Sequence, residues 1–127
     1  MDKAILVEID LKKSERIVSA LETAAIRVAV AMWVHFPEYE DWRFVLASRN
    51  LDTLTLREAY SRVNGILTKD GLSLREIPTI FIMKTTEPFI RALRKVYGKA
   101  ESVNGMRLGG RTWGDRFIED AYAYKIA

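Results

Sequence analysis

The clearest pattern along the chain is the nearly continuous apolar run RVAVAMWVHF, residues 27–36. Alternate residues of an extended strand point to opposite faces, so Met32 and Trp33 would lie on different sides of a sheet. Because both sides are largely apolar, we expect this strand near the centre of a sheet. The loop PEYED follows, and WRFVLAS (42–48) predicts a second strand that returns antiparallel to the first.

The segment 2–24 carries an apolar pattern that fits two different elements. Apolar and polar residues alternate over 4–9 as in a strand, yet Val7 and Val18 lie near one stripe of a helix. No Gly or Pro interrupts the segment, and Asp2 is a suitable N-cap. We predict one long helix, and a strand at 4–9 followed by a shorter helix is the alternative.

A second helix is predicted over 55–71, where the sequence marks both ends. Thr55 and Glu58 form the T-x-x-E pattern of a capping box. Leucine, valine and isoleucine side chains recur at helical spacing through the segment, and Gly71 is a natural stop.

The next stretch predicts a short buried strand at PTIFIMK (78–84) and then a helix over 85–98. Thr85 or Thr86 would cap this helix, and Pro88 suits its first turn because a proline there loses no intrahelical hydrogen bond. The apolar stripe of the helix lies opposite a basic side.

The C-terminal region contains closely spaced turn signals, Asn104-Gly105, Gly109-Gly110 and Gly114-Asp115, and ends in RFIEDAYAYKI. The stretches between them would pair as a meander. The element order is therefore about αββαβαββ. This order predicts one α+β domain over 1–127, with a mainly antiparallel sheet and helices packed on one face.

Composition supports a packed fold and excludes several chemistries. Of 127 residues, 49% are hydrophobic and 29% are charged, which suffices for a core. No apolar run is long enough to span a bilayer and no signal peptide is evident, so we expect a cytoplasmic protein without a membrane partner. The absence of cysteine excludes disulfides, thiolate zinc sites and cysteine nucleophiles.

Residues 105–112, GMRLGGRT, have the glycine spacing of a phosphate-binding P-loop, with Arg111 in place of its lysine. Such a loop needs a buried strand before it and a helix directly after it, so that backbone N–H groups surround the phosphates. The preceding GKAESVN is not strand-like, and Gly114-Asp115 interrupts the expected helix. We therefore predict no nucleotide site and interpret Gly109-Gly110 as a hairpin turn.

Positive charge is concentrated in residues 84–116, which contain eight basic and three acidic residues and so carry +5, whereas the whole chain carries +3. Basic residues at i, i+3 and i+4 share one side of the predicted helix, and tail arginines could extend this surface. Trp113 would then be a platform on which bases stack. The predicted nucleic-acid-binding residues are Arg91, Arg94, Lys95, Lys99, Arg107, Arg111, Trp113 and Arg116.

This basic region gives the leading functional hypothesis, a small non-enzymatic binding module that associates with nucleic acid. A charged outer face is also common on amphipathic helices that bind nothing. No zinc-finger spacing, ribonucleoprotein consensus or basic heptad accompanies the charge. We expect no cofactor and assign no catalytic or metal-ligating residue.

Two alternative functions use other residues. Tyrosines of the final strand, AYAYKI, would make an edge that pairs with a second copy or with a partner protein. Glu38, Glu40 and Asp41 in one loop would instead serve a metal-dependent hydrolase, which needs converging carboxylates. His35, the only histidine, is interpreted as a partly buried structural residue.

Overall fold

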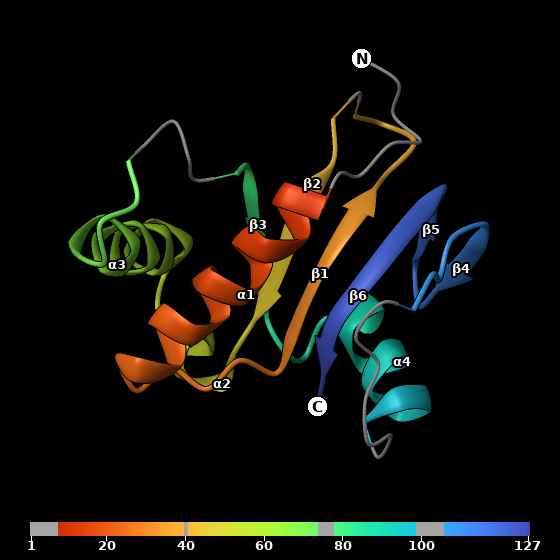
Figure 1. Cartoon of the computed structure of the whole chain (residues 1–127). Coiled ribbons are helices and arrows are strands. Elements are labelled where there is room, and N and C mark those ends of the chain that lie inside the picture. The colour runs from red at the N-terminus through yellow and green to blue at the C-terminus, as the bar shows by residue number, and fades with distance from the viewer. Residues whose placement is uncertain (1–7, 40, 74–77, 99–105) are drawn as a thin grey trace.

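The computed structural model describes residues 8–39, 41–73, 78–98 and 106–127 (Figure 1). A four-stranded sheet in the order β3-β2-β1-β6 lies in the middle, and β4 and β5 pair separately. The elements of the described residues are α1 (Glu8–Thr23), β1 (Val30–His35), β2 (Arg43–Ala47), α2 (Arg49–Asp52), α3 (Leu56–Lys69), β3 (Ile80–Ile82), α4 (Pro88–Tyr97), β4 (Arg111–Trp113), β5 (Arg116–Ile118) and β6 (Asp120–Ile126).

Strand β1 lies inside the sheet, and all six of its residues are buried. It pairs antiparallel with β2 and with β6, so that Met32 is opposite Val45 on one side and Ala123 on the other. Strand β3 adds to the outer side of β2 in parallel orientation. The predicted central strand is confirmed, as is the α+β class with a mainly antiparallel sheet.

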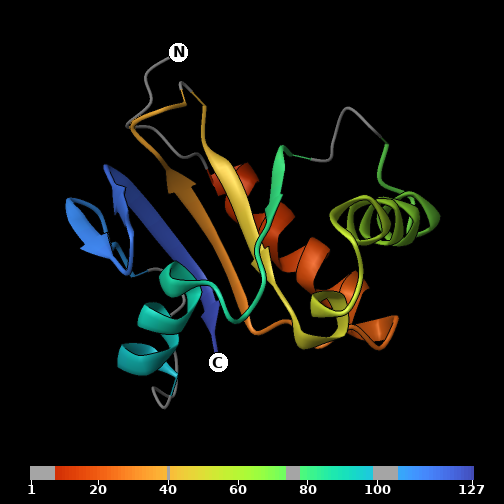
Figure 2. The ribbon, with the colours of Figure 1, turned by 180° about the vertical axis from the view of Figure 1, so that it is seen from behind.

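Different elements cover the two faces of the sheet. Trp33 and Phe44 pack in a cluster with α1 and α3, whereas Met32 and Val45 pack with α4 and the β4–β5 hairpin. Figures 1 and 2 show α1 on one side of the sheet and α4 on the other. The expectation that the helices share one face is therefore wrong for α4. Because β1 is apolar on both sides, each side needs a cover that removes it from water.

Helix α1 confirms the helical interpretation over Glu8–Thr23, whereas residues 1–7, with the expected cap Asp2, lie outside the described residues. The helix ends in a Schellman motif. Ala25 has a φ of 66°, and its N–H donates to the carbonyl of Glu22 at 3.1 Å. The N–H of the buried Ile26 donates to the carbonyl of Leu21 at 2.9 Å. The motif turns the chain directly from α1 toward β1.

The capping box of α3 is confirmed. Oγ1 of Thr55 accepts from the N–H of Glu58 at 3.1 Å, and Oε1 of Glu58 accepts from the N–H of Thr55 at 3.0 Å. The hydrogen bond from the backbone of Thr55, followed by the one with its side chain, holds the pKa of the Glu58 carboxyl below its ordinary value.

Among the helices of the described ranges, none has the length and apolar character needed to cross a membrane.

The expected cap of α4 is wrong, because the N-cap is Glu87 rather than Thr85 or Thr86. Thr85 is buried and bound to α2 instead. Its N–H donates to Oδ1 of Asp52 at 2.9 Å, and its hydroxyl contacts the other oxygen of the same carboxylate. Thr85 is therefore bound to a side chain of α2 and does not cap α4.

The hairpin turn falls on Gly114-Asp115, which joins β4 to β5, rather than on Gly109-Gly110. Gly114 has a φ of 62°, and a Cβ on it would lie 2.4 Å from the carbonyl of Pro88. The turn therefore needs glycine because it contacts the start of α4. The tail contains three strands, one more than the predicted order, and the short α2 was not predicted either.

Replacing Ala25 by glycine should raise the free energy of unfolding by roughly 0.5–1 kcal/mol, because a Cβ is strained at positive φ and the exposed Ala25 loses little packing. Gly71→Ala is the matched control. Gly71 has a φ of 99° at the corresponding position after α3, so this change should lower the free energy of unfolding by about 1 kcal/mol. Urea unfolding measures both changes, and a loss of stability in Ala25→Gly would contradict the motif.

Candidate anion-binding site

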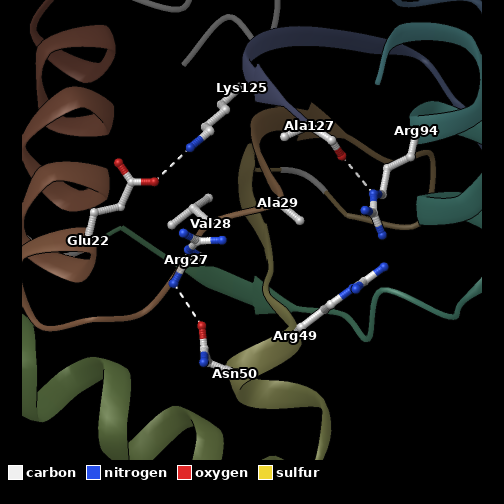
Figure 3. Close-up of a pocket in the computed structure, with 9 residues that line it drawn as sticks. All are labelled: Glu22, Arg27, Val28, Ala29, Arg49, Asn50, Arg94, Lys125 and Ala127. Atoms are coloured by element: carbon white, nitrogen blue, oxygen red, sulfur yellow. Dashed lines mark hydrogen bonds and ion pairs between the residues drawn. The ribbon is translucent and has the colours of Figure 1, made fainter. Parts of the chain in front are cut away.

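A cavity of about 530 Å³ opens at one end of the sheet, where five parts of the chain converge (Figure 3). They are the end of α1, the residues before β1, the start of α2, the second half of α4 and the end of β6. Four basic side chains and one carboxylate contribute to the lining. The lining residues are Glu22, Arg27, Val28, Ala29, Arg49, Asn50, Arg94, Lys125 and Ala127.

Hydrogen bonds of the backbone hold the walls of this cavity together. The N–H of Ala29 donates to the carbonyl of Ala47 at 2.8 Å, and the N–H of Ala127 donates to the carbonyl of Ala29 at 2.7 Å. These bonds keep the end of β6 and the end of β2 on either side of the chain that enters β1. The N–H of Arg27 donates to Oδ1 of Asn50 at 2.8 Å, which ties this entering chain to α2.

An irregularity in β6 determines which way Lys125 points. The register between β1 and β6 shifts at Tyr124, which is the extra residue of a β-bulge. Regular alternation would place Lys125 on the face of Ala123, toward α4. With the bulge, Lys125 reaches α1, where its Nζ lies 2.6 Å from Oε2 of Glu22.

Burial raises the pKa of the Tyr124 hydroxyl above its ordinary value, and the nearby carboxylates of Glu15 and Glu22 raise it further.

Two of the four cations have no anionic partner among the described residues. Lys125 is paired with the carboxylate of Glu22 in α1, and Nε of Arg94 donates to the backbone oxygen of Ala127 at 2.7 Å. The guanidinium groups of Arg27 and Arg49 make no ion pair or hydrogen bond with the described part of the chain. Figure 3 shows the guanidinium groups of Arg49 and Arg94 directed toward one another.

The charge of the lining is suited to binding an anion. Its charged side chains leave an excess of three positive charges, and like charges that face one another repel. An oxyanion between the arginines would replace this repulsion by charge-assisted hydrogen bonds. The lining contains no histidine, cysteine or serine, and its one carboxylate, Glu22, is held by Lys125. The cavity therefore has donors for an oxyanion, and its one acidic side chain is already paired.

The α4 part of the predicted basic surface is accessible. Arg91 and Lys95 are exposed, and neither is paired with another described residue. Arg94 is half-buried and lines the cavity. Lys99 lies outside the described residues. The structure thus joins the predicted helix face to the cavity through Arg94.

The other cations of the cavity were not predicted. Arg27, Arg49 and Lys125 are isolated basic residues in the sequence and belong to no motif or charged cluster. Their convergence depends on the pairing of β1 with both neighbours and on the bulge in β6. A local pattern could not have revealed this, because the three residues are brought together only by the tertiary fold.

Two of the three predicted tail arginines, Arg107 and Arg116, lie beside acidic side chains. Arg107 forms an ion pair with the carboxylate of Asp120. Nη1 of Arg116 lies 3.9 Å from Oε2 of Glu38, and the guanidinium group also lies over the ring of Phe36. Their contribution to a cationic surface is therefore smaller than the sequence suggested.

Trp113 does not provide a ring face for a base. Only 6% of it is exposed, and its ring centre lies 5.7 Å from that of Tyr97. The guanidinium carbon of Arg111 lies over the same ring at 5.2 Å, while Arg111 itself is exposed. The expected stacking role of Trp113 is therefore wrong for this structure, because the hairpin packs the ring against α4.

His35 is buried, with 3% exposed, as expected for a structural histidine. Its Nδ1 lies 3.8 Å from Oε1 of Glu119, and its ring meets that of Trp42 edge to face. Within the described ranges, no three His, Cys, Asp or Glu side chains are placed to hold a metal ion. Glu40, one of the three loop carboxylates of the hydrolase hypothesis, lies outside these ranges.

Strand β6 is at an edge of the sheet, but its outer side is partly paired. The N–H of Leu108 donates to the carbonyl of Ala121 at 3.1 Å, and the N–H of Ala123 donates to the carbonyl of Met106 at 2.9 Å. The tyrosines of β6 are half-buried and pack against the cluster beneath α1. Association through this edge stays a prediction.

Comparisons of this chain with protein-family models, with curated proteins and with solved structures found no match. The interpretation of the cavity therefore depends on its own geometry. Three arginines from separate elements converge there, and their charge exceeds that of the nearby acids.

Proposed function

We propose that this protein is a small non-enzymatic binding module for nucleic acid, with the cationic cavity as its main phosphate contact. The observation that carries the proposal is that Arg27, Arg49 and Arg94 line one cavity from three separate parts of the chain, with no Asp or Glu carboxylate of the described residues paired to them. Repulsion between these side chains costs free energy in the folded protein. A bound phosphate would offset that cost, because it brings negative charge and several acceptors to the same place.

Arginine is the side chain best suited to this role. Its planar guanidinium group offers N–H donors in a fork that matches two phosphate oxygens, and it remains charged at every physiological pH. Three such groups around one cavity give more donors than a single carboxylate ligand could accept. The chemistry therefore favours phosphate over a carboxylic acid.

The exposed side of α4 supports a polymeric ligand over a small one. Arg91 and Lys95 share this side with Arg94, since residues three and four apart are neighbours on a helix. Their charges lie outside the cavity, where one small anion would not use them. A chain of phosphates could contact the cavity and the helix together, and nucleic acid is the polymer that we propose.

Replacing Arg27, Arg49 and Arg94 together by glutamine should weaken binding to a single-stranded oligonucleotide and flatten its dependence on salt. Each phosphate that is no longer neutralised lowers the slope of log K against log salt by about 0.7, so the slope should fall by at least about 0.7. Fluorescence anisotropy at several sodium chloride concentrations measures both effects.

The matched control is Arg57→Gln, Arg62→Gln and Lys69→Gln, which removes the same charge from exposed positions of α3. These residues have no described partner and do not line the cavity. The control should keep most of the affinity and slope. Equal losses in both variants would contradict a localised site, and no binding by the unchanged protein at low salt would remove the proposal.

Inorganic phosphate should raise the melting temperature more than sodium chloride at equal ionic strength. A ligand at ten times its Kd stabilises the folded state by about 1.4 kcal/mol. The variant Arg49→Gln should keep its stability in chloride within about 0.5 kcal/mol, because Arg49 is exposed and unpaired with described residues, yet lose most of the phosphate effect. An undiminished phosphate effect in this variant, measured by calorimetry, would count against the cavity.

A further inference from the structure

We infer that the cavity takes the terminal phosphate monoester at the end of a nucleic-acid strand, in preference to the phosphodiesters within the strand. The inference rests on the proposed nucleic-acid binding and specifies which part of the polymer enters the cavity. It depends on three features of the site, which are the contacts that join its walls, its charge and the number of its free donors.

Contacts between neighbouring elements close the cavity at three places (Figure 3). An ion pair joins α1 to β6, a side-chain hydrogen bond joins α4 to the end of β6, and a backbone N–H joins the chain before β1 to α2. No described contact joins Arg49 of α2 to Arg94 of α4. The end of a strand can therefore enter between α2 and α4, where the guanidinium groups of Arg49 and Arg94 lie.

The charge of the cavity suits a monoester better than a diester. A phosphodiester carries one negative charge, and a terminal phosphate carries about −1.5 to −2 at pH 7. The charged side chains of the lining leave an excess of three positive charges. A terminal phosphate together with the first phosphodiester beside it would nearly balance this excess.

The available donors also fit a terminal phosphate. Arg27 and Arg49 each present five side-chain N–H donors that no described residue uses, and Arg94 keeps the donors on its two terminal nitrogens. A terminal phosphate has three unesterified oxygens, and a phosphodiester has two. The guanidinium groups of Arg49 and Arg94 are directed toward one another (Figure 3), so these two forks can share the three oxygens of a terminal phosphate, while a diester offers them only two.

The experiment compares three single-stranded oligonucleotides of one sequence, with an internal fluorophore and with a 5′-phosphate, a 3′-phosphate or neither. At least one phosphorylated strand should bind about 10-fold more tightly than the unphosphorylated strand, as expected for charge-assisted hydrogen bonds. The two phosphorylated arms show which end is accepted. Competition by a free nucleoside monophosphate shows whether the strand is needed.

Two variants locate the preference. Arg49→Gln should bring the affinities of the three strands to within about 2-fold of one another, since it removes a fork inside the cavity. Arg91→Gln lies outside the cavity and should weaken all three strands equally, so that the ratio persists. Circular dichroism confirms that each variant is folded.

Each remaining outcome has a definite meaning. Equal affinity of the unchanged protein for all three strands would overturn the inference and leave the proposed nucleic-acid binding in place. A nucleoside monophosphate that binds as tightly as the phosphorylated strand would overturn it in favour of a free nucleotide. Failure of every strand to bind would overturn the proposed function itself.

Discussion

Strand β1 is buried on both faces and hydrogen-bonded along both edges, and the other elements are arranged around it. Apolar side chains on each face require a cover, so α1 and α3 pack on one side and α4 with the β4–β5 hairpin on the other. Strands β2 and β6 satisfy its backbone groups, and Ala29 extends both ladders beyond its start. The entrance to β1 is consequently the place where the five parts of the chain that line the cavity lie close together.

The cationic cavity is a direct consequence of this meeting point. Four of the five parts of the chain that line the cavity bring a basic residue, and α1 brings the one acidic side chain, Glu22. The hydrogen bonds beside the entrance of β1 do not use the side chains of Arg27 or Arg49, so removing either of these side chains should leave the walls intact. Arg94 in addition joins α4 to Ala127. The charge of the cavity can therefore be changed without disturbing the backbone that positions it, as expected for a binding site built on rigid elements.

Local signals predicted the parts of the fold that local interactions determine. The capping box at Thr55, the stop at Gly71 and the two-sided apolar pattern of β1 each depend on neighbouring residues, and each is observed. The start of α4 was mispredicted because Asp52, distant in sequence, binds the threonine expected to cap it. The bulge at Tyr124, which sends Lys125 toward α1, has no signal in the alternating pattern of β6.

The candidate site was likewise predicted only where neighbouring residues determine it. Its α4 side followed from helical spacing, whereas its other cations needed the tertiary fold. A spectrum that resolves the Nε–Hε groups of individual arginines, recorded during a titration with inorganic phosphate, examines the site directly. We expect saturable shifts at Arg27, Arg49 and Arg94, with Arg57 and Arg62 unchanged. Small shifts of similar size at all five arginines, without saturation, would show diffuse screening and contradict a phosphate site in the cavity.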